Sequence, residues 1–295
     1  MGDTLVLLNA RAGALIDVGA DHVRAALASS LKGRGDRVEV RLVRPGYLKD
    51  EIEQAAQSDI STLIVGGGDG SAGCAVHSLA GSNKTLGVLP FGTMNLFATD
   101  LGMPADIQKA IEMIGDARPK KIDLGRVNGR YFHSLWGLGF LSQMARAREE
   151  VRGHTLGRLF GVGLAAIRAL RRTSPFTLDF RTESRREHVE ALAVLVTNNR
   201  FGPNWRRPVL DEGVLEVHIV EHAGALSKLK ASANLIAGTW RNDDDTDGIR
   251  SLDARHLVIS RKRSRTFAST DGELRREQIP MRYEIKPGAL TVLSL

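Results

Sequence analysis

Short apolar runs alternate with stretches of helical spacing over residues 1–118. The runs TLVLL (4–8), TLIV (62–65) and TLGVLP (85–90) have the length and apolar character of buried strands. Between them lie segments such as LKDEIEQAA (48–56), in which apolar positions recur every three or four residues. Strands that alternate with helices predict a parallel sheet covered on both faces, in an α/β domain.

Beyond residue 118 the pattern changes to strand-like runs with few helical segments. Such runs lie at 188–197, 214–221, 256–260, 265–269 and 281–285. Two further strands, within 120–140, are joined by Asn128-Gly129, a dipeptide that favours a type I′ hairpin turn. We therefore predict two domains: an α/β domain over 1–118, which residues 287–295 could rejoin, and a β-rich domain over 119–286.

Composition and charge narrow the classes of function. The chain has 295 residues, 42% of them hydrophobic, and no apolar run approaches the roughly 18 residues of a membrane-spanning helix. The net charge of +7 suits phosphorylated ligands, anionic membranes or nucleic acid. Aromatic residues, at 5%, are too few for a platform that stacks single-stranded nucleic acid. With a single cysteine and no signal-peptide pattern, we expect a cytoplasmic protein that binds no nucleic acid.

The segment LIVGGGDGSAG (63–73) carries the clearest chemical signal. Glycines between a strand and a helix let backbone N–H groups approach phosphate oxygens, and the helix N-terminus adds partial positive charge. The segment is not a P-loop, because no Gly-Lys-Ser/Thr follows. Asp69 would repel a phosphate directly, so it needs a Mg²⁺ ion or a bound hydroxyl as mediator. The alternative is a tight turn in which Asp69 caps the helix.

Two more loops end neighbouring strands of the predicted sheet. LPFGTMNLFATDLGMP (89–104) supplies Gly92, Thr93 and Asn95, and NARAG (9–13) supplies Arg11. The carboxyl ends of parallel strands meet at one edge, where ligands bind in such sheets. The sequence therefore predicts a nucleotide-phosphate site built from three loops.

The chain resembles the diacylglycerol kinase-like lipid kinases over essentially its whole length. The matching motifs, in the family's order and spacing, are GGDGS (67–71), PFGTMNLFA (90–98), IDLG (122–125), PVLDEGVLEV (208–217) and DGE (271–273). The first of these motifs is shared with NAD kinases and phosphofructokinases. The resemblance to this family therefore rests on the whole ordered set of motifs.

The resemblance implies phosphorylation of a lipid hydroxyl by ATP with Mg²⁺. It also implies a Rossmann-like α/β fold for the first domain, a β-rich sandwich for the second, and a nucleotide site in the cleft between them. The implied nucleotide-binding residues are Asn9, Arg11, Gly13, Gly67, Gly68, Asp69, Gly70, Ser71, Gly73, Gly92, Thr93 and Asn95. Glu273 would accept the proton with Asp271 beside it and Asp69 also in the catalytic set, although the sequence does not separate Asp271 from Glu273 by role. Read alone, DGE also fits an ordinary type I′ turn.

The chain departs from the family pattern at Met94, Leu96 and Thr99. An acidic and a basic position, at 96 and 99, are both replaced. Losing both members of a charge pair can leave stability nearly unchanged. We therefore interpret the two replacements as a change in a supporting interaction and not as a sign of an inactive enzyme.

A structural Mg²⁺ site of some family members maps onto the Glu212 side chain and the carbonyls of Val209 and Val214. Glutamate is one carbon longer than the usual aspartate, and a solvated turn is the alternative. The acidic segment 241–250 lacks the final glutamate of a calcium loop, because Ala254 stands there, so we expect an acidic surface loop. The basic amphipathic segment 155–172 is interpreted as a packed helix, with a membrane-surface helix as the alternative.

The partner implied is a lipid substrate met reversibly at a membrane surface. The oligomeric state is left open, with a homodimer as one option. Two other functions remain: a kinase of a small soluble alcohol or NAD, and a catalytically silent protein that binds lipid or nucleotide.

Overall fold

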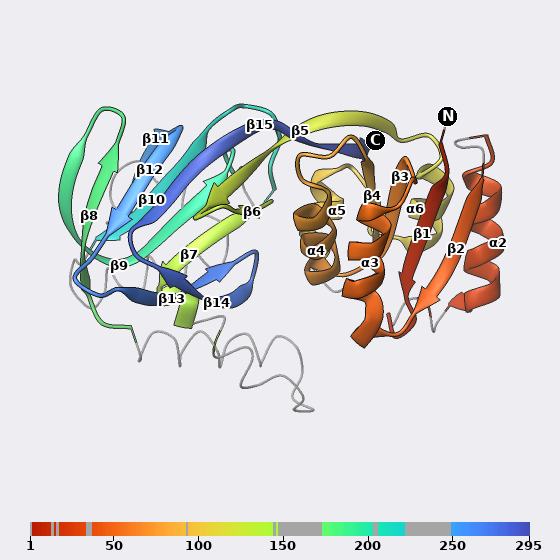
Figure 1. Cartoon of the computed structure of the whole chain (residues 1–295), viewed down its shortest axis with the longest axis horizontal. Helices are drawn as coiled ribbons and strands as arrows, with labels where there is room; N and C mark the ends of the chain where they lie inside the picture. Colours follow the sequence, from red (N-terminus) through yellow and green to blue (C-terminus); the bar gives the residue numbers. More distant parts are fainter. Residues whose placement is uncertain are drawn as a thin grey trace. The chain divides into compact units, whose positions relative to one another are not determined.

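The structure is a computed structural model of the chain (Figure 1). It describes residues 2–12, 15, 18–33, 37–92, 94–143, 146, 173–202, 206–221 and 249–295. The chain divides into two compact units, unit 1 (Met1–Leu124 with Lys286–Leu295) and unit 2 (Gly125–Ile285). It passes from unit 1 to unit 2 within strand β5 (Arg118–Val127) and returns within β15 (Met281–Ser294).

Unit 1 has the alternating strands and helices that the sequence predicts. Its elements before β5 are β1 (Thr4–Asn9), α2 (Ala20–Ser30), β2 (Val38–Val43), the 3-10 helix η1 (Pro45–Tyr47), α3 (Leu48–Gln57), β3 (Thr62–Gly67), α4 (Asp69–Leu79), β4 (Thr85–Pro90), α5 (Leu96–Asp100) and α6 (Ile107–Met113). Strands β1 and β3 have six residues each and are almost fully buried, as expected for a sheet covered on both faces. The Rossmann-like α/β prediction is confirmed.

The strand order of the unit 1 sheet changes direction along the chain, because β2 lies on one side of β1 and β3 and β4 lie on the other. Its order is β4-β3-β1-β2, all parallel, and the end of β15 adds a parallel strand beside β4. Right-handed crossovers place α2 on one face and α3 and α4 on the other, and Figure 1 shows α3 and α4 side by side in front of the strands. The reversal falls between β1 and β3, and the carboxyl ends of such strands form a ligand crevice.

Unit 2 is built from antiparallel strands, which confirms the β-rich prediction. Its elements after β5 are β6 (Arg130–Phe132), β7 (Leu135–Gly139), β8 (Phe176–Thr182), β9 (Arg186–Asn198), β10 (Leu215–Glu221), β11 (Ile249–Ala254), β12 (His256–Ser260), β13 (Arg265–Thr270) and β14 (Glu273–Gln278). The main order is β14-β13-β7-β9-β8-β12-β15, with β10 and β11 extending from β9 and β6 pairing with β5.

The unit 2 sheet curls over the larger of the two apolar clusters among its described residues. The rings of Trp136 on β7 and Tyr283 on β15 meet edge to face, with centroids 5.1 Å apart. Strands β9, β8 and β12 separate these two strands within the sheet, so the rings can touch only if the sheet folds back on itself. Both side chains are buried in a cluster of apolar residues drawn from strands throughout the unit.

The segment 120–140 differs in one respect from its prediction. Asn128 and Gly129 both have positive φ, 47° and 85°, which confirms the type I′ turn. The prediction of two strands is wrong, because a break at His133 and Ser134 separates β6 from β7 and gives three strands. The break has a physical cause, described below: backbone N–H groups there bind a carboxylate instead of a neighbouring strand.

Two predicted segments, the helix at 155–172 and the acidic residues 241–248, lie outside the described residues. Within the described ranges, none of the helices combines the length and the apolar character that crossing a bilayer requires.

Gly125 provides a test of the packing in unit 2. A Cβ atom there would lie 2.1 Å from the Cζ atom of Phe132, whose ring is fully buried. We expect Gly125→Ala to lower the free energy of unfolding by about 1–3 kcal/mol, the usual cost of overpacking a core. Urea unfolding followed by circular dichroism measures this.

Gly202→Ala is the matched control for that substitution. A Cβ at Gly202 would make only ordinary contacts, the nearest at 3.5 Å. An equal loss of stability in the two variants would contradict the packing described for Phe132.

Candidate functional site

Three turns lie at the carboxyl edge of the unit 1 sheet, after β1, β3 and β4. After β1, the Asn9 side chain accepts a hydrogen bond from the backbone N–H of the exposed Arg11 (3.0 Å), and the Asn9 carbonyl accepts one from Ala12 (2.9 Å). After β3, helix α4 begins at Asp69, with Gly68 as its N-cap residue. The reversal of the sheet between β1 and β3 makes this edge the expected ligand crevice of unit 1.

The turns after β3 and β4 touch through their backbones. A Cβ atom on Gly92 would lie 2.2 Å from the Cα of Gly68. A Cβ atom on Gly67 would lie 2.6 Å from the Oγ of Ser71. The two turns can therefore approach each other only because Gly68 and Gly92 have no side chain, and Gly67 leaves room for Ser71 within the turn after β3. The two glycine-rich turns converge, as the sequence predicts.

Asp69 links the turn after β3 to helix α5. Its Oδ1 atom accepts a hydrogen bond from the backbone N–H of Phe97 at 3.3 Å, and no side chain caps α4. The alternative in which Asp69 caps its own helix is therefore wrong. Its Oδ2 atom makes no hydrogen bond or ion pair within the described part of the chain, so it is the oxygen that could face a cation.

Asn95 is the scaffold of the turn after β4. Its φ of 51° is left-handed, and its side-chain amide donates to the carbonyls of Pro90 and Gly92, both at 3.0 Å. The Gly92 N–H donates back to Asn95 Oδ1 at 2.8 Å. The Thr99 hydroxyl donates to the Asn95 carbonyl at 3.0 Å, so a neutral hydrogen bond supports α5 where the charged pair is replaced.

The carboxyl edge has the features that hold nucleotide phosphates. The N–H groups of Asp69 and Gly70, the first two of α4, have no acceptor within the described part of the chain, and the helix dipole is positive at this end. Within the described ranges, no three or more His, Cys, Asp or Glu side chains gather into a metal site. A Mg²⁺ ion here would be held by phosphate oxygens and one or two carboxylates, which is its usual mode in kinases.

Of the remaining residues predicted to bind phosphate, some lie at the start of α4 and others lie outside the described residues. Gly70, Ser71 and Gly73 lie in the first turns of α4, directly after the glycine run. Gly13 and Thr93 lie outside the described residues. The role of the whole set in binding a nucleotide stays a prediction.

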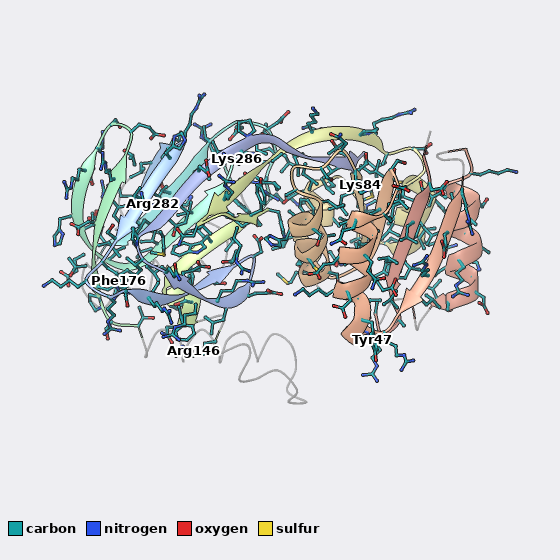
Figure 2. The ribbon with its side chains drawn as sticks, in the orientation of Figure 1. Tyr47, Lys84, Arg146, Phe176, Arg282 and Lys286 are labelled. Atoms are coloured by element: carbon teal, nitrogen blue, oxygen red, sulfur yellow. The ribbon has the colours of Figure 1, made fainter. Side chains whose placement is uncertain are left out.

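Pattern reasoning missed two residues at the same edge. Tyr47 ends η1 directly after β2, is 59% exposed, and has the Arg44 guanidinium 5.8 Å from its ring centroid. Figure 2 shows Tyr47 at the end of unit 1 where β2 finishes. The available signal was position alone, because any residue that directly follows a parallel strand lies at this edge.

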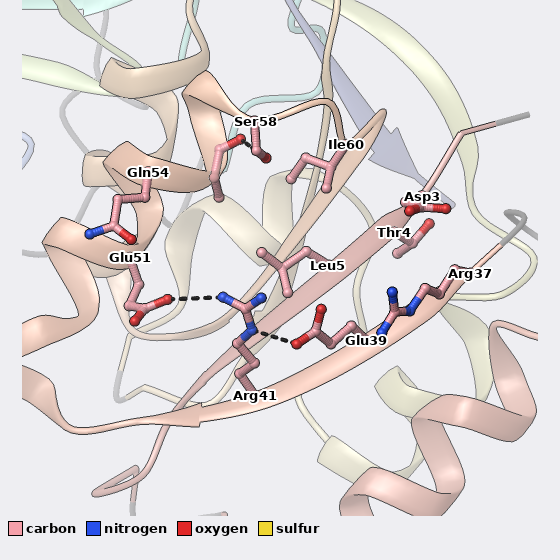
Figure 3. A pocket seen from close by; sticks show the side chains of 11 residues that line it. Asp3, Thr4, Leu5, Arg37, Glu39, Arg41, Glu51, Gln54, Ser58 and Ile60 are labelled. Atoms are coloured by element: carbon pink, nitrogen blue, oxygen red, sulfur yellow. Dashed lines mark hydrogen bonds and ion pairs between the residues drawn. The ribbon is translucent and has the colours of Figure 1, made fainter.

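A cavity of about 250 Å³ in unit 1 lies at the opposite ends of the strands (Figure 3). Its lining includes the first residues of β1 and β2. Inside it, Arg41 donates to Glu39 (2.6 Å) and Glu51 (3.3 Å), and the hydrogen bond from Arg41 lowers the pKa of Glu39. A guanidinium already paired with two carboxylates has little attraction left for an anion, so this cavity is not assigned as the nucleotide site.

In unit 2, three consecutive backbone N–H groups bind the Asp271 carboxylate. Oδ2 accepts from His133 (3.0 Å), and Oδ1 accepts from Ser134 (2.9 Å) and Leu135 (3.0 Å). The Asp271 N–H donates in return to the Leu135 carbonyl (2.8 Å). With both oxygens engaged and the side chain only 13% exposed, Asp271 anchors its turn to the backbone of residues 133–135.

A buried polar network continues behind this anchor. The His133 carbonyl accepts hydrogen bonds from the Asn198 amide (2.9 Å) and the Arg207 guanidinium. The Asn198 N–H donates to the Ser134 carbonyl (2.9 Å). Arg207 and Asn198 are almost completely buried, so the segment that holds Asp271 is itself fixed from β9 and the 206–214 loop.

Glu273 begins β14, just beyond a tight turn. Asp271 and Gly272 have φ of 49° and 86°, so the type I′ turn that this dipeptide fits when read alone is present. The Glu273 side chain is 54% exposed, and its Oε2 accepts a hydrogen bond from the Arg275 guanidinium at 2.6 Å. The structure therefore gives the two carboxylates of the DGE motif different surroundings: Asp271 is bound by the backbone, and Glu273 faces outward.

The predicted metal position around Glu212 stays untested. Glu212 Oε2 accepts a hydrogen bond from the Arg200 N–H (3.1 Å), and the Arg200 guanidinium lies 3.5 Å from the same oxygen. The Val214 N–H is 3.3 Å from Asn199 Oδ1, and Val209 is 38% exposed. A cation at Glu212 would have to compete with that guanidinium.

Comparison with known families places both halves of the chain. Residues 3–127 match the diacylglycerol kinase catalytic domain, and residues 143–294 match the YegS C-terminal NAD kinase beta sandwich-like domain. The solved structure of a diacylglycerol kinase from Bacillus anthracis str. Sterne superposes with a TM-score of 0.73 over 100% of this chain and 97% of that one. At 20% identity that likeness shows the fold.

Two curated diacylglycerol kinases and a YegS-like protein are similar in sequence. The Staphylococcus epidermidis (strain RP62A) enzyme is 40% identical over 32% of this chain and 31% of its own length, and that of Bacillus subtilis (strain 168) is 29% identical over 65% of each. The chain thus spans less than two thirds of the length of both. A probable YegS-like lipid kinase of Chromohalobacter salexigens is 27% identical over 78% of this chain and 74% of its own.

Asp271→Asn tests the anchoring role of that carboxylate. Asparagine tolerates positive φ, but its amide group offers donors to N–H groups that need an acceptor. We expect the free energy of unfolding to fall by about 2–3 kcal/mol, the cost of charged hydrogen bonds lost in a buried site. Urea unfolding gives the value.

Asp116→Asn is the control, because Asp116 is exposed. Its effect should stay within about 0.5 kcal/mol, as for ordinary surface positions. A similar small effect at Asp271 would show that the three N–H contacts do not stabilise the fold.

Proposed function

This chain belongs to the diacylglycerol kinase-like lipid kinase family, and we propose that it transfers the γ-phosphoryl group of ATP to the hydroxyl of a lipid. The observation that carries the proposal is the difference between the surroundings of the two carboxylates in the DGE motif. The backbone saturates Asp271, and this leaves Glu273 as the outward carboxylate of a rigid turn. A protein that only binds lipid or nucleotide would not require one carboxylate to be bound by the backbone while the next one is exposed.

The proposed donor site is the carboxyl edge of the unit 1 sheet. The N-terminus of α4 would bind the phosphates, and the contact between Gly68 and Gly92 keeps side chains away from them. Bound Mg²⁺ would neutralise charge on the phosphates and orient them for transfer. Asp69 Oδ2 is the oxygen of this edge that could hold it, while Oδ1 stays with Phe97.

Glu273 is the proposed proton acceptor. As the lipid hydroxyl oxygen forms its bond to the γ-phosphorus, the bond from that phosphorus to the β–γ bridging oxygen breaks and ADP leaves. The hydroxyl proton passes to the Glu273 carboxylate. Arg275, which donates to Glu273, fixes the direction in which the carboxylate points. Asp271 acts on the reaction only by holding the turn.

We further propose that the lipid is met at an anionic membrane surface, to which the protein binds peripherally. The net charge of +7 favours attraction to acidic headgroups. On β13, Phe267 is 46% exposed, lies opposite Arg276 on β14, and has the Arg146 guanidinium 4.8 Å from its ring centroid. An exposed aromatic ring between cations is suited to the boundary between headgroups and acyl chains.

Transfer of radiolabelled phosphate from ATP tests the proposal. The acceptors would be a diacylglycerol, a ceramide and a free sphingoid base in mixed micelles, with glycerol and NAD as soluble acceptors. Label in any lipid supports a lipid kinase. Label only in glycerol or NAD would favour the soluble-acceptor alternative, and ATP binding without transfer would favour a silent protein.

Glu273→Gln should separate chemistry from stability. Removing the proton acceptor should lower kcat by about 10²–10⁴-fold, the usual contribution of a general base. Because the side chain is half exposed, the midpoint of urea unfolding should not move. The exposed Glu190→Gln on β9 is the control and should keep the wild-type kcat. A fall of less than about threefold in Glu273→Gln would remove Glu273 from the mechanism.

Gly92→Ala tests the donor site. The new Cβ would push against the Gly68 backbone, so the two turns must separate. We expect the Kd for MgATP, measured by isothermal titration calorimetry, to rise at least about tenfold, a loss of about 1.4 kcal/mol. Gly202→Ala should bind MgATP as the wild type does. Unchanged binding in Gly92→Ala would place the nucleotide elsewhere.

A further inference from the structure

The outer face of the unit 2 sheet has a groove of about 580 Å³. Its described lining comes from β9, β8, β12 and β15, which follow one another in the sheet (Figure 1). Phe180 on β8 and Met281 on β15 are buried in the core of the unit. Because side chains alternate between the two faces of a strand, the neighbouring Arg181 and Arg282 lie on the opposite face, in the groove. Small-molecule sites have volumes of about 300–1,000 Å³.

Strand register places three arginines in one row across this groove. Arg181 lies opposite Arg186 on β9 and, on its other side, opposite Val258 on β12. Val258 in turn lies opposite Arg282 on β15. Residues directly opposite in antiparallel strands share a face of the sheet, so all four line the groove. The row crosses three gaps between strands, a length of about 14 Å.

This arginine row is unfavourable for the fold unless an anion binds to it. Like charges directly opposite in neighbouring strands are destabilising, and Arg181 and Arg186 form such a pair. All three arginine residues are exposed. Among the residues that the structure describes, none offers their guanidinium groups a hydrogen bond or an ion pair.

The carboxylates closest to the row in the sheet have other partners. Two of them line the groove, and the third follows Arg282 by two residues on β15. Their contacts are those of Asp179 with the His188 ring (2.9 Å), Glu183 with the N–H of Arg255 (2.9 Å) and Glu284 with the Arg126 guanidinium (2.6 Å). The row itself therefore keeps its positive charge for a ligand.

We propose that the arginine row binds a soluble ligand with two or more phosphate groups, at a site built from unit 2 alone. Arg181 and Arg186 would hold one phosphate, because the fork of a guanidinium matches phosphate oxygens with paired N–H donors. Arg282, two strands away from Arg181, would hold a second. The half-buried Val258 between them offers an apolar contact to the part of the ligand that joins the phosphates. This inference does not depend on the proposed function.

The surroundings of the row favour a soluble ligand over the headgroups of a membrane. Peripheral binding to a bilayer combines cations with apolar side chains that enter the acyl boundary. Among the described residues, the exposed large hydrophobic side chains all lie outside the groove lining, and Phe267 on β13 is one of them. A groove also encloses a small molecule better than it meets a flat surface.

Isothermal titration calorimetry without nucleotide or divalent cations tests the site. The probes are fructose 1,6-bisphosphate, which has a phosphate at each end, fructose 6-phosphate, which has one, and inorganic tripolyphosphate. We expect the bisphosphate to bind at least about tenfold more tightly than the monophosphate, because hydrogen bonds to a second charged group add to the first. Arg282→Gln should remove this difference, and Arg181→Gln should weaken binding of the bisphosphate and of tripolyphosphate at least about tenfold.

Arg24→Gln is the matched control. Arg24 is exposed on α2 in unit 1, so its replacement changes the net charge equally but leaves the groove intact. It should bind both probes as the wild type does. An equal loss in Arg24→Gln and Arg181→Gln would show attraction by net charge only, and would overturn the site. So would the absence of Arg181-dependent binding for both fructose 1,6-bisphosphate and tripolyphosphate.

Thermal unfolding gives a second readout. Without ligand, Arg181→Gln should keep or raise the unfolding midpoint, because it removes one of two opposed like charges. Fructose 1,6-bisphosphate should raise the midpoint of the wild type and not that of the variant. A fall of the midpoint in ligand-free Arg181→Gln would show that the guanidinium already stabilises the fold, and would contradict the argument for a missing anion.

Sedimentation with vesicles distinguishes the two sources of phosphate. Vesicles of phosphatidylglycerol and of phosphatidylcholine would be compared with the wild type, Arg181→Gln and Arg24→Gln. We expect the two variants to bind phosphatidylglycerol vesicles equally. Vesicle binding that only Arg181→Gln abolishes, without binding of the soluble probes, would overturn the proposal in favour of membrane headgroups. None of these measurements uses phosphoryl transfer, so failure of the proposed kinase activity would leave the arginine site standing.

Discussion

The carboxylate of Asp271 is the constraint on which the arrangement of unit 2 around the β13–β14 turn depends. Its oxygens accept hydrogen bonds from the N–H groups of His133, Ser134 and Leu135, and this interrupts the sheet between β6 and β7. Charge-assisted bonds of this kind are about twice as strong as neutral ones. The interruption fixes the β13–β14 turn against β7. Thr270 then lies opposite Glu273 on one side and opposite Trp136 on the other.

In unit 1 the corresponding constraint is that Gly68 and Gly92 have no side chains. The sheet order β4-β3-β1-β2 brings the ends of β3 and β4 together at the edge where the sheet reverses direction. Gly68 and Gly92 then meet backbone to backbone, and Asn95 and Asp69 fix the turns from either side. Rigid turns without side chains suit a large anion, because the backbone N–H groups are already placed when it arrives.

The sequence predicted what depends on local pattern. The alternation of strands and helices, the β-rich second half, and the turns at Asn128-Gly129 and Asp271-Gly272 all follow from the periodicity and φ preferences of neighbouring residues. The sequence could not separate Asp271 from Glu273, because the N–H groups that bind Asp271 come from residues more than 130 positions away.

Hydrogen exchange measured by mass spectrometry tests the division of roles between the two carboxylates most directly. In Asp271→Ala, the backbone N–H groups of His133, Ser134 and Leu135 should lose their protection. In Glu273→Ala they should keep it, while phosphoryl transfer to lipid is lost. Unchanged protection in Asp271→Ala, or equal loss of it in both variants, would contradict the account in which one carboxylate holds the turn and the other takes the proton.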